Sequence, residues 1–109
     1  MRVKTVDDNL IEFDNGYTIS VSDDNDSVND VYNYADFKSI LDEISDIDFP
    51  KELKFEYCDD YGFRFGFGIF MIFVPCYSVQ NGYYNSDVTV FYNDKNVLNA
   101  VPSAESADA

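Results

Sequence analysis

The sequence predicts a single α+β domain: an antiparallel β-sheet in the order βββαβββ with one helix packed on a face. Most of the chain alternates apolar and polar residues with a period of two, which is typical of half-buried strands. One stretch instead places apolar residues at the i, i+3, i+4 and i+7 spacing of an amphipathic helix. Breaks rich in Asn, Asp and Gly separate these stretches. A chain of 109 residues is long enough for one core and too short for two.

The N-terminal third is expected to form a three-stranded meander. The stretches RVKTV and LIEF alternate as strands and are separated by a turn at residues 7–9. A second turn, at residues 14–16, precedes the strand YTISV. It contains an Asn-Gly step, which favours a type I′ hairpin turn because both central residues of that turn need a positive φ.

A helix of about three turns is expected within residues 34–49, after a polar loop. Asn33 or Asp30 could cap its start, and Pro50 lies beyond its end. The apolar positions that define its buried face are Phe37, Ile40, Leu41 and Ile44.

The second half of the chain is expected to return to strands. Residues 51–57 alternate, and residues 63–74 are interpreted as one long strand in the centre of the sheet. Gly66 and Gly68 would leave a flat patch on one face of that strand, suited to the helix or to a partner. A turn at Asn81-Gly82 would lead into the last strand, which ends at residue 92.

The last residues of the chain are small and polar and show no periodicity. The domain is therefore expected to span residues 1–98, and residues 99–109 are expected to be a flexible tail.

The charge of the chain limits the partners that it can bind. There are 21 Asp and Glu against 7 Lys and Arg, which gives a formal net charge of −14. Such a surface repels DNA, RNA and anionic lipid and attracts basic proteins. The most apolar run, residues 65–74, is about half the length of the roughly 20 residues that a membrane helix needs. We therefore expect no direct binding of nucleic acid or membrane.

The acidic residues are concentrated in one segment. Residues 7–48 contain thirteen Asp and Glu and a single basic residue, Lys38. Carboxylates held a few ångströms apart could imitate a row of phosphates, and a generic acidic surface is the alternative. The expected partner-binding residues are Asp7, Asp8, Asp14, Asp23, Asp24, Asp26, Asp30, Asp42, Glu43, Asp46 and Asp48.

The residue content argues against catalysis. Histidine, the commonest general base, is absent, and only Cys76 and Ser78 are candidate nucleophiles near a turn. We therefore expect no enzymatic activity and no cofactor. The start of the chain is polar, without the pattern of a signal segment, so the two cysteines are expected to be reduced and the protein cytoplasmic.

The acidic loop that begins at Asp23 resembles a calcium-binding loop only superficially. Counted from Asp23, it has no glycine at position six, and Tyr34 occupies position twelve, where a bidentate Glu belongs. We assign no metal site, although an irregular cation site remains an alternative.

A second candidate surface lies around the Asn-Gly turn of residues 81–82. Tyrosines and amides are common in recognition surfaces, and they also stabilise hairpins, so both interpretations remain open. The ligand or metal-binding alternative would use Cys76, Tyr77, Gln80, Asn81, Tyr83 and Tyr84. An exposed strand edge among the aromatic strands would also allow a homodimer.

Three motifs resemble a known family. The sequences YADF at residues 34–37, DYGFRF at 60–65 and FVPCYSVQNGYY at 73–84 are similar to a family of small uncharacterised proteins from phages, prophages and other mobile elements of Firmicutes. The resemblance implies a phage or prophage origin and action in the bacterial cytoplasm, and it implies no particular activity. Members are richer in Cys and His where this chain has residues 23–30.

Size, charge and resemblance together give a hypothesis of function. Small acidic phage proteins often inhibit host defences by occupying the nucleic-acid groove of a nuclease. We therefore expect a non-enzymatic inhibitor or decoy, of the anti-CRISPR or anti-restriction kind, that binds a basic nuclease or a CRISPR or restriction effector through an acidic, nucleic-acid-mimicking face.

Overall fold

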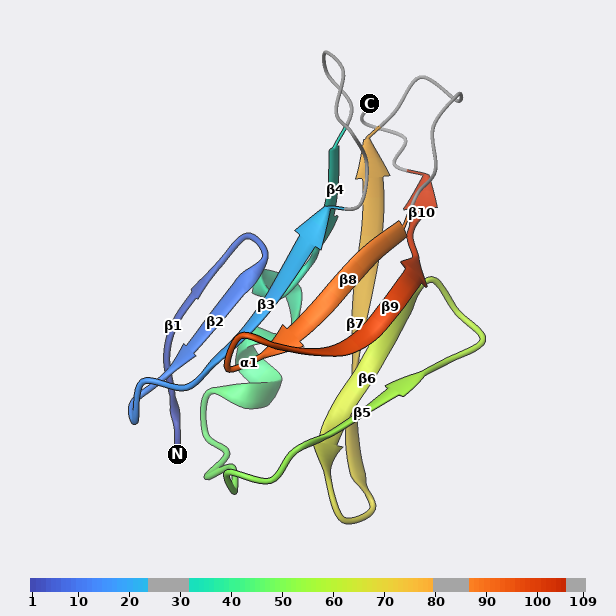
Figure 1. Cartoon of the computed structure of the whole chain (residues 1–109). Helices are drawn as coiled ribbons and strands as arrows, with labels where there is room; N and C mark the ends of the chain where they lie inside the picture. Colours follow the sequence, from blue (N-terminus) through green and yellow to red (C-terminus); the bar gives the residue numbers. More distant parts are fainter. Residues whose placement is uncertain (24–31, 80–86, 106–109) are drawn as a thin grey trace.

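The computed structural model describes residues 1–23, 32–79 and 87–105 and shows an elongated α+β molecule of mainly antiparallel strands (Figure 1). Its principal extents are 40 × 25 × 24 Å. The first sheet has the order β1-β2-β3-β8-β9 and is antiparallel throughout. Its strands are β1 (Val3–Asp7), β2 (Leu10–Phe13), β3 (Thr18–Asp23), β8 (Asp87–Tyr92) and β9 (Lys95–Pro102).

The second sheet has the order β10-β7-β6-β5, and β4 also pairs with β7. Its strands are β4 (Tyr32–Ala35), β5 (Lys54–Tyr57), β6 (Gly62–Phe67), β7 (Phe70–Val79) and β10 (Ala104–Glu105). The pairing of β10 with β7 is parallel, and the others are antiparallel. Between β4 and β5 lie a 3₁₀ turn, η1 (Lys38–Ile40), and a single short helix, α1 (Leu41–Ile44).

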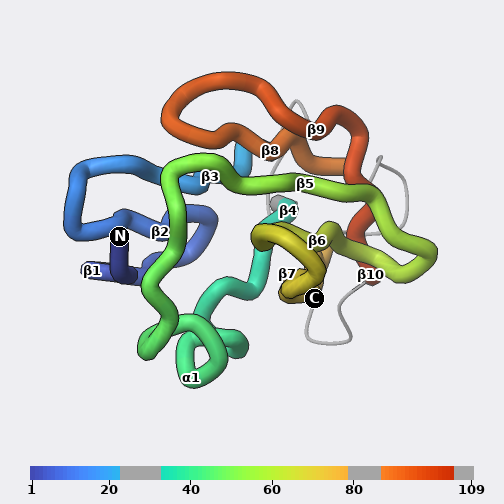
Figure 2. Tube along the Cα trace, turned by 90° about the horizontal axis from the view of Figure 1, so that it is seen from below, coloured from blue at the N-terminus to red at the C-terminus, as the bar shows by residue number. Residues whose placement is uncertain are grey.

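One apolar core joins the two sheets and the helical segment, by which we mean η1, α1 and the residues up to Phe49 (residues 38–49). Phe49 follows α1 and is 1% exposed. Its ring centroid lies 5.6 Å from that of Phe13 in the first sheet and 5.9 Å from that of Phe65 in the second. Ile40 and Ile44 are also buried and belong to the same core cluster as Phe49. The helical segment therefore closes one side of the space between the sheets (Figure 2).

The α+β class and the strands on both sides of one helix agree with the sequence-based prediction, but the helix is much shorter than expected. Residues 32–35, which include the first half of YADF, form β4 instead, and Asn33 is buried there rather than capping a helix. The carboxylate of Asp36 accepts the N–H of Ser39 at the start of η1. Residues 38–48 are rich in Ser, Asp and Ile, which have low helix propensity, and Asp42 and Asp46 repel each other at i, i+4 spacing.

The single long strand predicted for residues 63–74 was wrong. The chain reverses at Gly68 and Ile69, so β6 and β7 form a hairpin with Phe67 opposite Phe70. Gly68 has φ +58°, which suits the first central position of a type II′ turn. Gly66 leaves no open patch, because a Cβ there would overlap the carbonyl oxygen of Phe70. The reversal places both β6 and β7 inside one sheet.

The predicted flexible tail begins too early. Residues 99–102 belong to β9, and Ala104 and Glu105 pair with Tyr77 and Ser78 of β7. The C-terminal part of the chain therefore crosses from the first sheet to the second. Within the described residues, none of the helices has the length and apolar character needed to cross a membrane.

Candidate partner-binding surface

The turn between β1 and β2 presents two of the predicted acidic residues. Asp7 ends β1 and Asp8 follows it, and both are exposed. Asn9 completes the turn with φ +64°. Its side-chain oxygen accepts the N–H of Ala35 at 2.8 Å, and its carbonyl accepts the N–H of Val21 at 3.0 Å. These bonds attach the turn to β3 and β4, so the backbone that carries Asp7 and Asp8 is held in place.

The helical segment presents four more of the predicted acidic residues. Its inward side buries Ile40 and Ile44. The apolar residues occupy the side of the segment that packs on the core, so the acidic residues face solvent. These exposed residues are Asp42, Glu43, Asp46 and Asp48.

Contacts at both of its ends join the helical segment to the residues on either side of β1. Near its start, Lys38 Nζ lies 3.3 Å from a carboxylate oxygen of Asp8. Near its end, the N–H of Phe49 donates to the carbonyl of Met1 at 2.7 Å, and the amine of Met1 lies 2.9 Å from Asp48. The hydrogen bond and charge of that amine hold the pKa of Asp48 below its ordinary value. We call the exposed set Asp7, Asp8, Asp42, Glu43, Asp46 and Asp48 the acidic surface.

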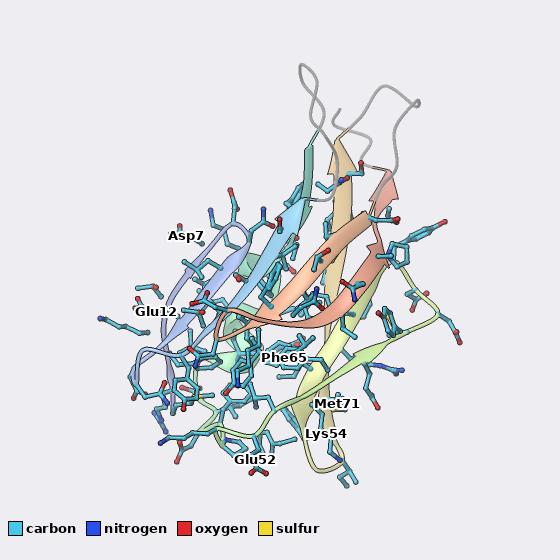
Figure 3. The ribbon with its side chains drawn as sticks, in the orientation of Figure 1. Asp7, Glu12, Glu52, Lys54, Phe65 and Met71 are labelled. Carbon is cyan, nitrogen blue, oxygen red and sulfur yellow. The ribbon has the colours of Figure 1, made fainter. Side chains whose placement is uncertain are left out.

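Most carboxylates of the acidic surface are not neutralised within the molecule. Asp8 faces Lys38, although both side chains are more than half exposed, so the pair is weak. Asp48 has the amine of Met1. Among the described residues, the other four have no ion pair. In Figure 3, Asp7 and Glu12 lie at the left of the molecule, whereas Phe65 lies near its centre.

The remaining acidic residues of the prediction are placed in part. Asp14 lies in the exposed turn between β2 and β3, and its carboxylate accepts the N–H of Arg2 at 3.1 Å. Asp23 ends β3. The residues Asp24, Asp26 and Asp30, with the calcium-like loop, lie outside the described residues.

The alternative ligand surface loses its central residue. Cys76 points inward from β7 and is 0% exposed, and burial, with a smaller effect of the Cys58 charge, raises its pKa to about 12. Tyr77 points outward and its ring lies 5.7 Å from that of Tyr34 on β4. The other residues of that alternative, Gln80, Asn81, Tyr83 and Tyr84, lie outside the described residues.

The sequence interpretation missed an exposed apolar group at the end of the β6–β7 hairpin. Ile69 is 102% exposed and Phe70 is 45% exposed. This hairpin forms the lower end of the molecule in Figure 1. The available signal was the Gly68-Ile69 pair, since glycine before one further residue is typical of a two-residue type II′ turn.

The class defined so far is a two-sheet α+β protein with exposed carboxylates on the β1–β2 turn and the helical segment and an apolar hairpin at one end. Among the described residues, His, Cys, Asp and Glu form no cluster of three or more that could hold a metal ion. Comparison of the chain with protein-family models, curated proteins and solved structures finds no match.

Proposed function

We propose that this protein is a non-enzymatic inhibitor, of phage or prophage origin, that acts in the bacterial cytoplasm. Its target is a basic nucleic-acid-binding protein of host defence, such as a nuclease or a CRISPR or restriction effector. The acidic surface occupies the groove in which the target would hold DNA or RNA.

The observation that supports this proposal is an excess of exposed carboxylates. Among the described residues, most of those on the acidic surface have no ion pair, and the turn that carries Asp7 is attached to the sheets by hydrogen bonds. A net charge of magnitude roughly 2 to 8 keeps a small domain soluble, whereas this chain has −14. Repulsion between the carboxylates destabilises the fold, and solubility alone does not require so much charge. Binding to a basic partner would offset this destabilisation. Because the turn of Asp7 is attached through Asn9, little ordering is needed on binding.

The nucleophile candidates favour binding over catalysis. Cys76 and Ser78 are both 0% exposed. With its pKa raised to about 12, the thiol of Cys76 is almost entirely protonated at neutral pH. Neither side chain is placed to attack a substrate.

Two triple variants with the same charge test the proposal. D7N/D42N/E43Q removes three carboxylates from the acidic surface. D59N/D60N/D94N removes three exposed carboxylates from the β5–β6 and β8–β9 turns. Each changes the net charge from −14 to −11, since −14 + 3 = −11. Immobilised protein is incubated with a bacterial lysate, and captured proteins are identified by mass spectrometry.

We expect wild type and D59N/D60N/D94N to capture the same basic nucleic-acid-binding proteins, and D7N/D42N/E43Q to lose at least about tenfold of that capture. Added DNA should release the captured proteins. An equal loss of capture in both triple variants would show that only net charge matters, which would contradict a role of the acidic surface. Captured proteins that include no basic nucleic-acid binders would also contradict the proposal.

A further inference from the structure

Among residues 1–23, 32–79 and 87–105, none pairs its backbone with one edge of β7 over residues 70–74. On its other edge β7 pairs with β6 over this whole stretch. The strand β4 pairs only with residues 76–79. Within the described residues, the last backbone bond on the β4 side joins the N–H of Asp36 to the carbonyl of Pro75 at 2.8 Å.

The alternation of the strand identifies the groups at this edge. The N–H of Cys76 donates to Tyr61 on the β6 side, and the carbonyl of Pro75 faces the β4 side. Successive residues direct their backbone groups to opposite edges, so Met71 and Phe73 face the β4 side, as Pro75 does. In the part of the chain that the structure describes, nothing bonds to their N–H and C=O groups, so these groups could pair with another strand.

The side chains at this edge are apolar and outward-facing. Phe73 is 37% exposed and Met71 is partly exposed on the outer face of β7, whereas Ile72 and Val74 are buried. Ile69, at the turn, is exposed, and Phe70, on the same face of the strand as Ile72, is 45% exposed where the hairpin ends. An exposed apolar edge of this kind is a template for strand pairing, and proteins usually block such edges.

We propose that this edge binds the same edge of a second copy, giving a two-fold dimer with a sheet continuous across both molecules. With the axis at Ile72, Met71 lies opposite Phe73 of the other copy, and each exchanges its N–H and C=O with the other. Pro75 has no N–H, so it ends the pairing.

The charge distribution selects a second copy as the occupant. Between Arg64 and Asp87 the chain has no Asp, Glu, Lys or Arg, in a molecule with net charge −14. Two copies can therefore pair these stretches of β7 without placing charged side chains of residues 65–86 opposite each other, and a basic strand would find no charge in this stretch to attract it. The overall repulsion between copies is screened by salt, so salt strengthens the dimer.

Met71→Pro tests the pairing directly. Proline removes the N–H that faces the open edge and leaves the bonds to β6 intact, as edge strands allow. Met71→Thr is the matched control, because it shortens the side chain and keeps the N–H. Circular dichroism and thermal unfolding establish that each variant is folded, and Phe73→Glu, which places like charges across the axis, is the second disrupting variant.

Sedimentation velocity is measured over a concentration series at low and high salt. We expect wild type to shift from 12.5 kDa to twice that mass, with a dissociation constant at least about tenfold lower in high salt. Met71→Pro and Phe73→Glu should raise that constant at least about tenfold, and Met71→Thr only a few-fold. A wild type that stays monomeric overturns the proposal and leaves the edge to a strand of another protein. A dimer that all the folded variants retain equally also overturns it.

Discussion

Phe49 is the residue that connects the two sheets most directly. Its ring packs against Phe13 of β2 and against Phe65 and Phe67 of β6, at 5.6, 5.9 and 5.8 Å between centroids. Phe49→Ala would leave a cavity between the sheets, and we expect a loss of about 3–5 kcal/mol in the free energy of unfolding. Urea denaturation measures it. Phe70→Ala, at a 45% exposed position, should lose about 1 kcal/mol or less, and equal losses would contradict this packing.

The two cysteines should differ strongly in reactivity. Both are free thiols, Cys76 buried and Cys58 partly exposed. Burial raises the pKa of Cys76 to about 12, so its thiolate is rare at pH 8. In the single-thiol variants Cys58→Ala and Cys76→Ala, we expect a thiol reagent to label Cys76 at least about 100-fold more slowly than Cys58, with equal rates in denaturant. Fast labelling of folded Cys76 would restore it as a candidate nucleophile.

At the scale of elements, local patterns predicted the meander of β1, β2 and β3. The strands β2 and β3 bury alternate residues, β1 packs Val3 and Val6 partly against the core, and each turn has its own polar residues. The predicted apolar face was correct for Phe37, Ile40 and Ile44, which are buried, and wrong for Leu41, which is 40% exposed. The pattern overestimated the helix, because the same apolar residues can be buried by one short turn of helix followed by a loop that ends at Phe49. Periodicity reports burial more reliably than it reports length.

Two hairpins were missed for a different reason. The interpretation ended the last strand at residue 92 and treated residues 63–74 as one strand. The β8–β9 turn is made by Asn93 and Asp94, both with positive φ, and these residue types tolerate the left-handed region. The β6–β7 turn begins with Gly68, which lay inside an apolar run that looked continuous. Strand β4 and the pairing of β10 depend on contacts distant in sequence, which no local pattern contains.

Gly66 and Gly16 test two separate roles of glycine in these elements. A Cβ at Gly66 would overlap a backbone oxygen of β7, which cannot move without breaking the hairpin. At Gly16 there is open space, and only φ +89° opposes a side chain. We expect Gly16→Ala to lose about 1–2 kcal/mol and Gly66→Ala to lose more. Thermal unfolding checks the order, and a smaller loss at Gly66 would contradict the close approach of β6 and β7.

At the scale of the whole molecule, the sequence identified which segment is acidic, and the fold explains how its parts meet. Asp8 and Lys38 are thirty residues apart in the chain and 3.3 Å apart in space. That proximity follows from the contacts of the helical segment with the residues on either side of β1, which the sequence did not predict. The charge count predicts a basic partner, whereas the arrangement of the acidic surface depends on the packing of the core.

The net charge also predicts what the molecule avoids. We expect no binding of duplex DNA or of RNA in a gel-shift assay up to about 100 µM protein, because few cations are present to replace the counterions of a polyanion. D7N/D42N/E43Q should behave in the same way. A shift by wild type that weakens with salt would indicate a basic site that the described surface does not show.

Competition with DNA on a captured target tests the central claim most directly. The target is held with labelled DNA, and each protein is added at increasing concentration in low and in moderate salt. We predict that wild type and D59N/D60N/D94N displace the DNA with similar potency, that D7N/D42N/E43Q needs at least about tenfold more protein, and that salt weakens every displacement. A target that binds the protein and the DNA at the same time, or displacement that does not depend on the acidic surface, would contradict the account.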